Sequence, residues 1–117
     1  MAPSVARLKG GVLAVGSPGA DRITTAMQQF LINYLQLGMP LGDAIAHPRG
    51  PVATSGEVIN LKAEPGLDLP EIDLPVSVFP GLVMYFGGVG AAVFDSDGGF
   101  DVAADPRREG GVFNPDA

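Results

Sequence analysis

The fold is decided by the stretch Val12-Leu13-Ala14-Val15-Gly16-Ser17-Pro18-Gly19-Ala20-Asp21-Arg22-Ile23. It passes from a β-branched apolar run, through a turn with two glycines and a proline, into a strong helical pattern. From Ile23 onward, apolar residues recur at i, i+4, i+7, i+8, i+11 and i+12, which predicts one apolar helix face. Gly38 follows as the expected left-handed stop. The predicted apolar face consists of Ile23, Met27, Phe30, Leu31, Tyr34 and Leu35.

Working outward from this unit, the pattern predicts two hairpins and a second short helix. Residues 5–8 and 12–15 flank Lys9-Gly10-Gly11, and a Gly-Gly pair suits a tight turn. Residues 89–94 and 100–103 flank the polar turn 95–99 and predict a closing hairpin. A helix over 41–46 ends before Pro48.

The middle and the tail of the chain give weaker patterns. We expect a loop over 50–56, a strand over 57–61, an irregular proline-rich connection over 63–80 and a polar, irregular tail over 105–111. Together these elements predict an α+β fold in a single domain, residues 1–117, without an internal boundary.

Composition excludes several classes of function. The chain has 117 residues, with 13 acidic against 7 basic side chains, and a net charge of −6 argues against a nucleic-acid partner. Cysteine is absent, which excludes disulfides, thiolate metal sites and a cysteine nucleophile. His47 is the only histidine, which argues against a multi-histidine metal site.

Targeting and membrane segments are not predicted. Residues 1–7 lack the apolar run of a signal peptide. Residues 74–94 carry no charge and are long enough to span a bilayer. They also contain repeated prolines and glycines that break a helix, so we expect a pair of buried strands with a turn between them.

The strongest candidate for a functional site in the chain is the turn Gly16-Ser17-Pro18-Gly19-Ala20. Backbone N–H groups before a helix are unpaired, and the helix dipole adds partial positive charge, so such a turn can hold an anion or a developing oxyanion. The lysine and hydroxyl residue of a P-loop are missing. From the residues alone, an ordinary strand-to-helix turn remains the alternative reading.

An ordered series of motifs resembles the small subunit of γ-glutamyltranspeptidases over nearly the whole chain. The motifs are Met1-Ala2-Pro3-Ser4, Gly16-Ser17-Pro18-Gly19, Arg22-Ile23-Thr24-Thr25, Asp43-Ala44-Ile45-Ala46-His47-Pro48-Arg49, Phe86-Gly87-Gly88-Val89 and Ala103-Ala104-Asp105-Pro106-Arg107-Arg108.

The resemblance implies an N-terminal-nucleophile hydrolase, a four-layer αββα sandwich, of which this chain is a part. In that family a precursor cuts itself, and the new N-terminal Thr attacks a γ-glutamyl amide, such as that of glutathione, without a cofactor or metal. The acyl group then passes to water, an amino acid or a peptide. The oxyanion-hole backbone N–H pair falls on Gly19 and Ala20, where Ala20 replaces a family glycine.

The resemblance also implies that the nucleophile is not in this chain. The family's catalytic Thr, and the Ser pair that binds the substrate α-carboxylate, both precede the position of Met1. Thr24 and Thr25 fall within the predicted helix, at positions without a catalytic role. We therefore expect a C-terminal portion of the enzyme, from a truncated gene, a late start codon or an expressed segment, that is inactive alone.

Two other interpretations stay open at this stage. The chain could be a standalone, non-catalytic partner that completes the fold of another chain, or part of a related β-lactam side-chain acylase. The expected partners are the upstream segment with the large subunit and a small γ-glutamyl substrate, with self-association of the isolated chain. The compartment is undetermined, because an export signal would belong to upstream sequence.

The remaining candidates have structural explanations. We expect His47 to be a capped or exposed side chain at a helix end. Asp95, Asp97 and Gly98 lack the full calcium-loop pattern and predict a hairpin turn. Arg107 and Arg108 are expected to pair structurally with carboxylates.

Overall fold

The computed structural model describes residues 3–18, 22–53, 60–71, 73–108 and 111–113. Its main sheet has the strand order β1-β2-β6-β7, with every neighbouring pair antiparallel. Both predicted hairpins are confirmed, and β2 joins them by pairing with β6. The strands are β1 (Ser4–Leu8), β2 (Gly11–Gly16), β6 (Gly90–Asp95) and β7 (Phe100–Ala103).

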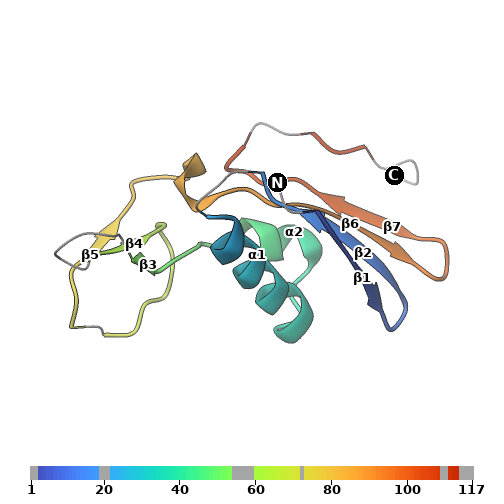
Figure 1. The fold of residues 1–117 in the computed structure, drawn as a ribbon, viewed down its shortest axis with the longest axis horizontal. Helices are drawn as coiled ribbons and strands as arrows, with labels where there is room; N and C mark the ends of the chain where they lie inside the picture. Colours follow the sequence, from blue (N-terminus) through green and yellow to red (C-terminus); the bar gives the residue numbers. More distant parts are fainter. Residues whose placement is uncertain (1–2, 19–21, 54–59, 72, 109–110, 114–117) are drawn as a thin grey trace.

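The helices cover one face of this sheet (Figure 1). They are α1 (Ile23–Leu31), the π-helix η1 (Ile32–Gln36) and α2 (Leu41–Ala46), and Gly38 has the expected positive φ of 68°. The prediction of a buried Leu35 is wrong. The wider π-turn changes the angular spacing of the residues after α1, so Leu35 is exposed while Asn33 is buried.

The hydrophobic core lies between these helices and the sheet. Alternation along β2 sends Leu13 and Val15 into the core and leaves Val12 and Ala14 on the opposite face. Phe30 and Ala26 supply the buried side of α1. The buried cluster consists of Leu13, Val15, Ala26, Phe30, Leu41, Ala44, Ile45, Val89, Ala91 and Val93.

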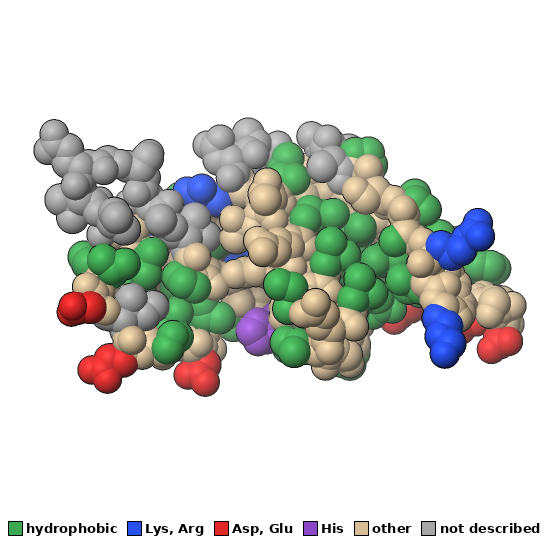
Figure 2. All heavy atoms as spheres, turned by 60° about the horizontal axis from the view of Figure 1, so that its bottom comes forward, with side chains coloured by type: hydrophobic (Ala, Val, Ile, Leu, Met, Phe, Trp, Pro, Cys, Tyr) green, Lys and Arg blue, Asp and Glu red, His purple; other side chains and the backbone are tan. Residues whose placement is uncertain are grey.

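The opposite face of the sheet is apolar but lacks a covering layer within the described residues. Its cross-strand rows are Val5, Ala14, Ala92 and Val102, and then Arg7, Val12, Phe94 and Phe100. Residues 111–113 and the sheet strands line an open groove of about 490 Å³ on this face. Figure 2 shows that hydrophobic side chains also reach the surface over the middle of the molecule, with the acidic ones toward its two ends.

A second, three-stranded sheet lies beside the helices (Figure 1) and corrects three predictions. The loop expected at 50–56 contains β3 (Val52–Ala53), and β4 (Leu61–Ala63) lies later than the strand expected at 57–61, of which 57–59 are outside the described residues. The connection expected to be irregular contains β5 (Val76–Val78), which pairs with β4 in parallel.

The prediction of paired strands within 74–94 is also wrong, because β5 and β6 belong to different sheets. Between them lies the short 3₁₀-helix η2 (Met84–Phe86). Backbone bonds from Leu61 N to Pro75 O and from Phe79 N to Ala63 O hold β5, so the flanking prolines do not prevent pairing. In the part of the chain that the structure describes, no helix is long and apolar enough to cross a membrane.

Candidate functional site

The glycine-rich turn joins β2 to α1, as predicted. β2 ends at Gly16 and α1 begins at Ile23, while Ser17 between them is fully buried. The predicted oxyanion residues Gly19 and Ala20 lie outside the described residues. Among the described residues no side chain caps the start of α1, and its first turn contains no acidic residue. The partial positive charge that the helix dipole places on the first N–H groups of α1 is therefore not offset by a described capping side chain.

The start of α1 rests on the segment that precedes β6. Arg22 Nη2 donates to the Tyr85 hydroxyl over 2.7 Å, and its guanidinium carbon lies 4.8 Å from the centre of the Tyr85 ring. Gly87 has a φ of 78°, and a Cβ there would lie 3.2 Å from Ala26 Cβ and 3.3 Å from Arg22 O. A glycine is therefore needed for this segment to approach the helix closely.

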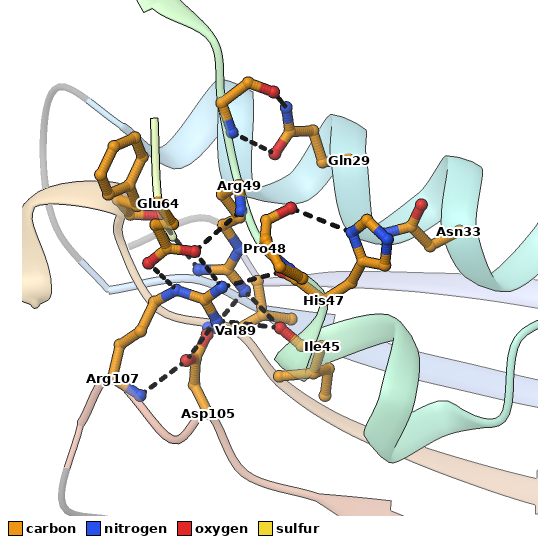
Figure 3. A network of polar contacts seen from close by, with 12 residues as sticks. Gln29, Asn33, Ile45, His47, Pro48, Arg49, Glu64, Val89, Asp105 and Arg107 are labelled. Atoms are coloured by element: carbon orange, nitrogen blue, oxygen red, sulfur yellow. Dashed lines mark hydrogen bonds and ion pairs between the residues drawn. The ribbon is translucent and has the colours of Figure 1, made fainter. Parts of the chain in front are cut away.

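A buried network of four charged side chains contacts the segment that precedes β6 (Figure 3). It consists of Arg49, Glu64, Asp105 and Arg107. Asp105 Oδ2 accepts from Arg49 Nη2 over 2.6 Å, and Asp105 Oδ1 accepts from Arg107 Nη1 over 2.9 Å. Arg107 also donates from Nε and Nη2 to the Glu64 carboxylate. Two arginines thus balance two carboxylates, and all four residues are at most 6% exposed.

The pKa shifts follow from burial and pairing. Burial lowers the pKa of Arg49, and neighbouring Arg107 lowers it further, against the attraction of Asp105. Burial alone would raise the pKa of Asp105, but the hydrogen bond from Arg107 N and the charge of Arg49 hold it below its ordinary value. Burial opposes the charged form of Arg107, but its bonds to Glu64 and Asp105 raise its pKa.

The network fixes both ends of the Gly87-Gly88 segment. Phe86 O accepts from Arg49 Nη1 over 3.0 Å, and Val89 N donates to Asp105 Oδ2 over 2.8 Å. Because Gly87 packs against the first turn of α1, the network also supports the helix that follows the glycine-rich turn. Arg107 additionally donates to Ile45 O and His47 O at the end of α2.

The remaining predicted residues are placed as follows. Thr24 and Thr25 lie in the first turn of α1, as expected. His47 ends α2 half-buried, with Nδ1 3.0 Å from Pro48 O. Asp95 and Asp97 form the predicted hairpin turn, in which Asp97 N donates to Asp95 Oδ1.

The arginine predictions are confirmed in part. Arg107 pairs with carboxylates, as expected. Arg108 forms no ion pair with any residue that the structure describes. The described part of the tail, residues 105–108 and 111, is irregular as expected, but Asp105 and Arg107 are buried rather than solvated, and residues 109–110 lie outside the described residues. The sequence reasoning missed the roles of Arg49 and Glu64, and no local pattern marks Glu64 as the partner of a residue 43 positions away.

Comparison with known proteins gives the fold and the family. No curated protein matches the chain. Over 97% of its length the chain is similar to the transpeptidase enzyme CapD of Bacillus anthracis, with 28% identity, a TM-score of 0.76 and 70% of that chain covered. The γ-glutamyltranspeptidase of Pseudomonas nitroreducens, in complex with L-DON, is similar over 97% of this chain and 61% of its own, with 23% identity and a TM-score of 0.70.

A third structure, the T380A mutant of Helicobacter pylori γ-glutamyltranspeptidase, has 23% identity and a TM-score of 0.63, covering 92% of this chain and 61% of that one. These likenesses confirm the predicted α+β architecture of the N-terminal-nucleophile hydrolases. The γ-glutamyltranspeptidase sequence profile matches residues 1–114. The chain therefore belongs to the γ-glutamyltranspeptidase family.

Proposed function

We propose that this chain supplies the oxyanion-binding part of an enzyme that transfers γ-glutamyl groups to amino acids or peptides, or hydrolyses γ-glutamyl amides. The observation that carries the proposal is the family match over residues 1–114. The strand–turn–helix unit supports it, because α1 follows a glycine-rich turn and no described side chain caps its start. Such a helix start favours negative charge, which develops on the carbonyl oxygen during attack on an amide.

In this proposal the backbone N–H groups of Gly19 and Ala20 bind the oxyanion. The N–H of Ala20 survives the replacement of the family glycine, while its Cβ narrows the accessible φ range. The nucleophile is an N-terminal Thr outside these 117 residues, and the upstream small-subunit segment and the large subunit complete the site. The 117 residues alone are then inactive towards γ-glutamyl amides.

The oxyanion role is tested in the longer enzyme with a chromogenic γ-glutamyl anilide. Gly19→Pro deletes one N–H donor, and the loss of one such donor lowers kcat by roughly 10²–10³-fold. Ala20→Gly is the matched control, because it keeps the N–H and restores the family residue, so its kcat should be no lower than that of the parent. Near-parental turnover in a folded Gly19→Pro variant would move the oxyanion site elsewhere.

The location of the nucleophile is tested with the purified 117-residue chain. We expect no release of chromophore from the same anilide. Turnover that persists through repurification and is lost in Thr24→Ala or Thr25→Ala would contradict the proposal, because it would place the nucleophile on α1.

A further inference from the structure

Two arginines flank the Gly87-Gly88 segment without an ionic partner among the described residues. Arg22 lies against Gly87, since a Cβ on that glycine would come within 3.6 Å of Arg22 Cβ. Arg108 lies against Gly88, where an added Cβ would come within 2.7 Å of both Cδ and Nε of the arginine. Consecutive glycines thus let both side chains lie close to one backbone segment.

Both arginines have hydrogen-bonding capacity that the described chain leaves unused. The Nε atoms of Arg22 and Arg108 are buried and have no hydrogen-bond partner in the described part of the chain. Ser17 Oγ, in the turn that leads to Arg22, is in the same state. A buried donor without an acceptor loses its hydration without compensation, and the loss is larger when the donor is charged, so such groups normally have a partner when the protein functions.

The nearby buried carboxylates are already occupied. Both oxygens of Asp105 accept two hydrogen bonds each, from Arg49, Arg107 and Val89. Glu64 accepts from Arg49 N and from two nitrogens of Arg107. Asp105 therefore has no acceptor position left for Arg22 or Arg108, and three of the four acceptor positions of Glu64 are occupied.

We propose that Arg22 and Arg108 form a carboxylate subsite for the leaving or acceptor amino acid of the γ-glutamyl reaction. A guanidinium presents Nε–H and an Nη–H along one edge, and this pair matches the two oxygens of a carboxylate. Arg22 Nη2 donates to the Tyr85 hydroxyl, which orients the guanidinium, and the buried Nε of Arg22 has no acceptor among the described residues. The subsite adjoins the start of α1, which no described side chain caps and whose dipole also favours an anion.

This inference rests on the proposed function and deepens it. The α-carboxylate of the γ-glutamyl group is assigned by the family resemblance to a Ser pair upstream of Met1. The anion left for Arg22 and Arg108 is the carboxylate on the other side of the scissile amide. The enzyme then distinguishes a leaving group that carries a carboxylate from a neutral one of the same size.

The test uses a matched substrate pair in the longer enzyme: γ-glutamyl-alanine and γ-glutamyl-alaninamide. The measured quantity is the ratio of kcat/KM for the acid to kcat/KM for the amide. We expect a ratio of about 10 or more in the parent, because hydrogen bonds to charged groups contribute about 1.5–3 kcal/mol each. Arg22→Met and Arg108→Met should each lower the ratio at least fivefold, and Arg108→Lys should restore part of it.

A glycine pair gives a second test without any change of charge. Gly88→Ala puts a methyl group where the flexible end of Arg108 lies, and should lower the ratio in the same direction. Gly90→Ala is the control, since a Cβ there meets nothing within 4 Å. Arg7→Met, on the exposed part of β1, controls for general loss of positive charge.

Each outcome decides the inference. A parent ratio near one, or a ratio that Gly88→Ala and the arginine variants leave unchanged, overturns it even if some variants fold poorly, because the ratio compares two substrates on the same active molecules. If the enzyme turns over no γ-glutamyl substrate at all, the proposed function itself fails. Turnover of both substrates with an unaffected ratio refutes the subsite alone.

Discussion

Replacing Asp105 by Asn should severely destabilise the fold. The carboxylate receives four donors: Arg49 Nη2 at 2.6 Å, Val89 N at 2.8 Å, and Arg107 N and Nη1 at 2.9 Å. Asn has the same shape but only one oxygen. The NH2 group that replaces the other oxygen is itself a donor, so two of these four donors would lose their acceptor. The network would also change from neutral to a net charge of +1 in a buried site.

The expected cost follows from these losses. Removing one partner from a buried ion pair costs about 3–5 kcal/mol, because the remaining charge stays buried without compensation. At roughly 4 °C per kcal/mol for a domain of this size, the thermal midpoint should fall by about 12–20 °C. Asp101→Asn is the matched control, because Asp101 is exposed on β7, and its change should stay within about 0.5 kcal/mol.

The measurement is thermal unfolding of Asp105→Asn, Asp101→Asn and the parent at one protein concentration, followed by circular dichroism. If Asp105→Asn unfolds within a degree or two of the control, the charge balance of the network does not stabilise the fold. The reasoning from its hydrogen bonds would then be refuted.

Three further outcomes are expected. The folded-state pKa of Asp105 lies below its ordinary value, so its contribution to stability is full above about pH 4 and is lost as the pH falls through the folded-state pKa. The free energy of unfolding should therefore fall more steeply with acid in the parent than in Asp105→Asn, and equal slopes would contradict this. Gly11→Ala should cost about 1–3 kcal/mol or more, because its Cβ would lie 2.2 Å from Phe94 O, whereas Gly10→Ala meets nothing within 4 Å; similar urea midpoints would be the contrary result. The isolated chain should self-associate through its apolar sheet face and edge strand β1, so light scattering should report a mass that grows with concentration, and a constant monomer mass would refute it.

The parts of the fold that local patterns determine could be predicted from the sequence. Alternation and a Gly-Gly turn gave the first hairpin, and the apolar stripe from Ile23 gave α1. Leu35 was placed wrongly because nothing in the apolar spacing shows that the helix widens into a π-turn. The strand β5 was missed because prolines on either side resemble a loop, and only its pairing with β4 makes it a strand.

The candidate site divides in the same way. The glycine-rich turn before a helix has a recognisable local sequence, and its place between β2 and α1 is confirmed. The buried network has no recognisable local sequence, because Arg49 and Asp105 are 56 positions apart and meet only after the sheet and α2 have packed. Burial also decides which arginine is paired: Arg107 points into the network and Arg108, its sequence neighbour, lies on Gly88.

The charge balance of the buried network constrains how this sequence can diverge. Arg49, Glu64, Asp105 and Arg107 form a neutral set, so replacing any one of them by an uncharged residue leaves an uncompensated charge in the interior. A complete replacement by well-packed apolar side chains can be as stable as an ion network, but intermediate sequences that remove unequal numbers of arginines and carboxylates bury an uncompensated charge and are less stable than either end. Descendants of this sequence should therefore keep all four residues or exchange them in charge-balanced sets, so that positions scattered along the chain change together.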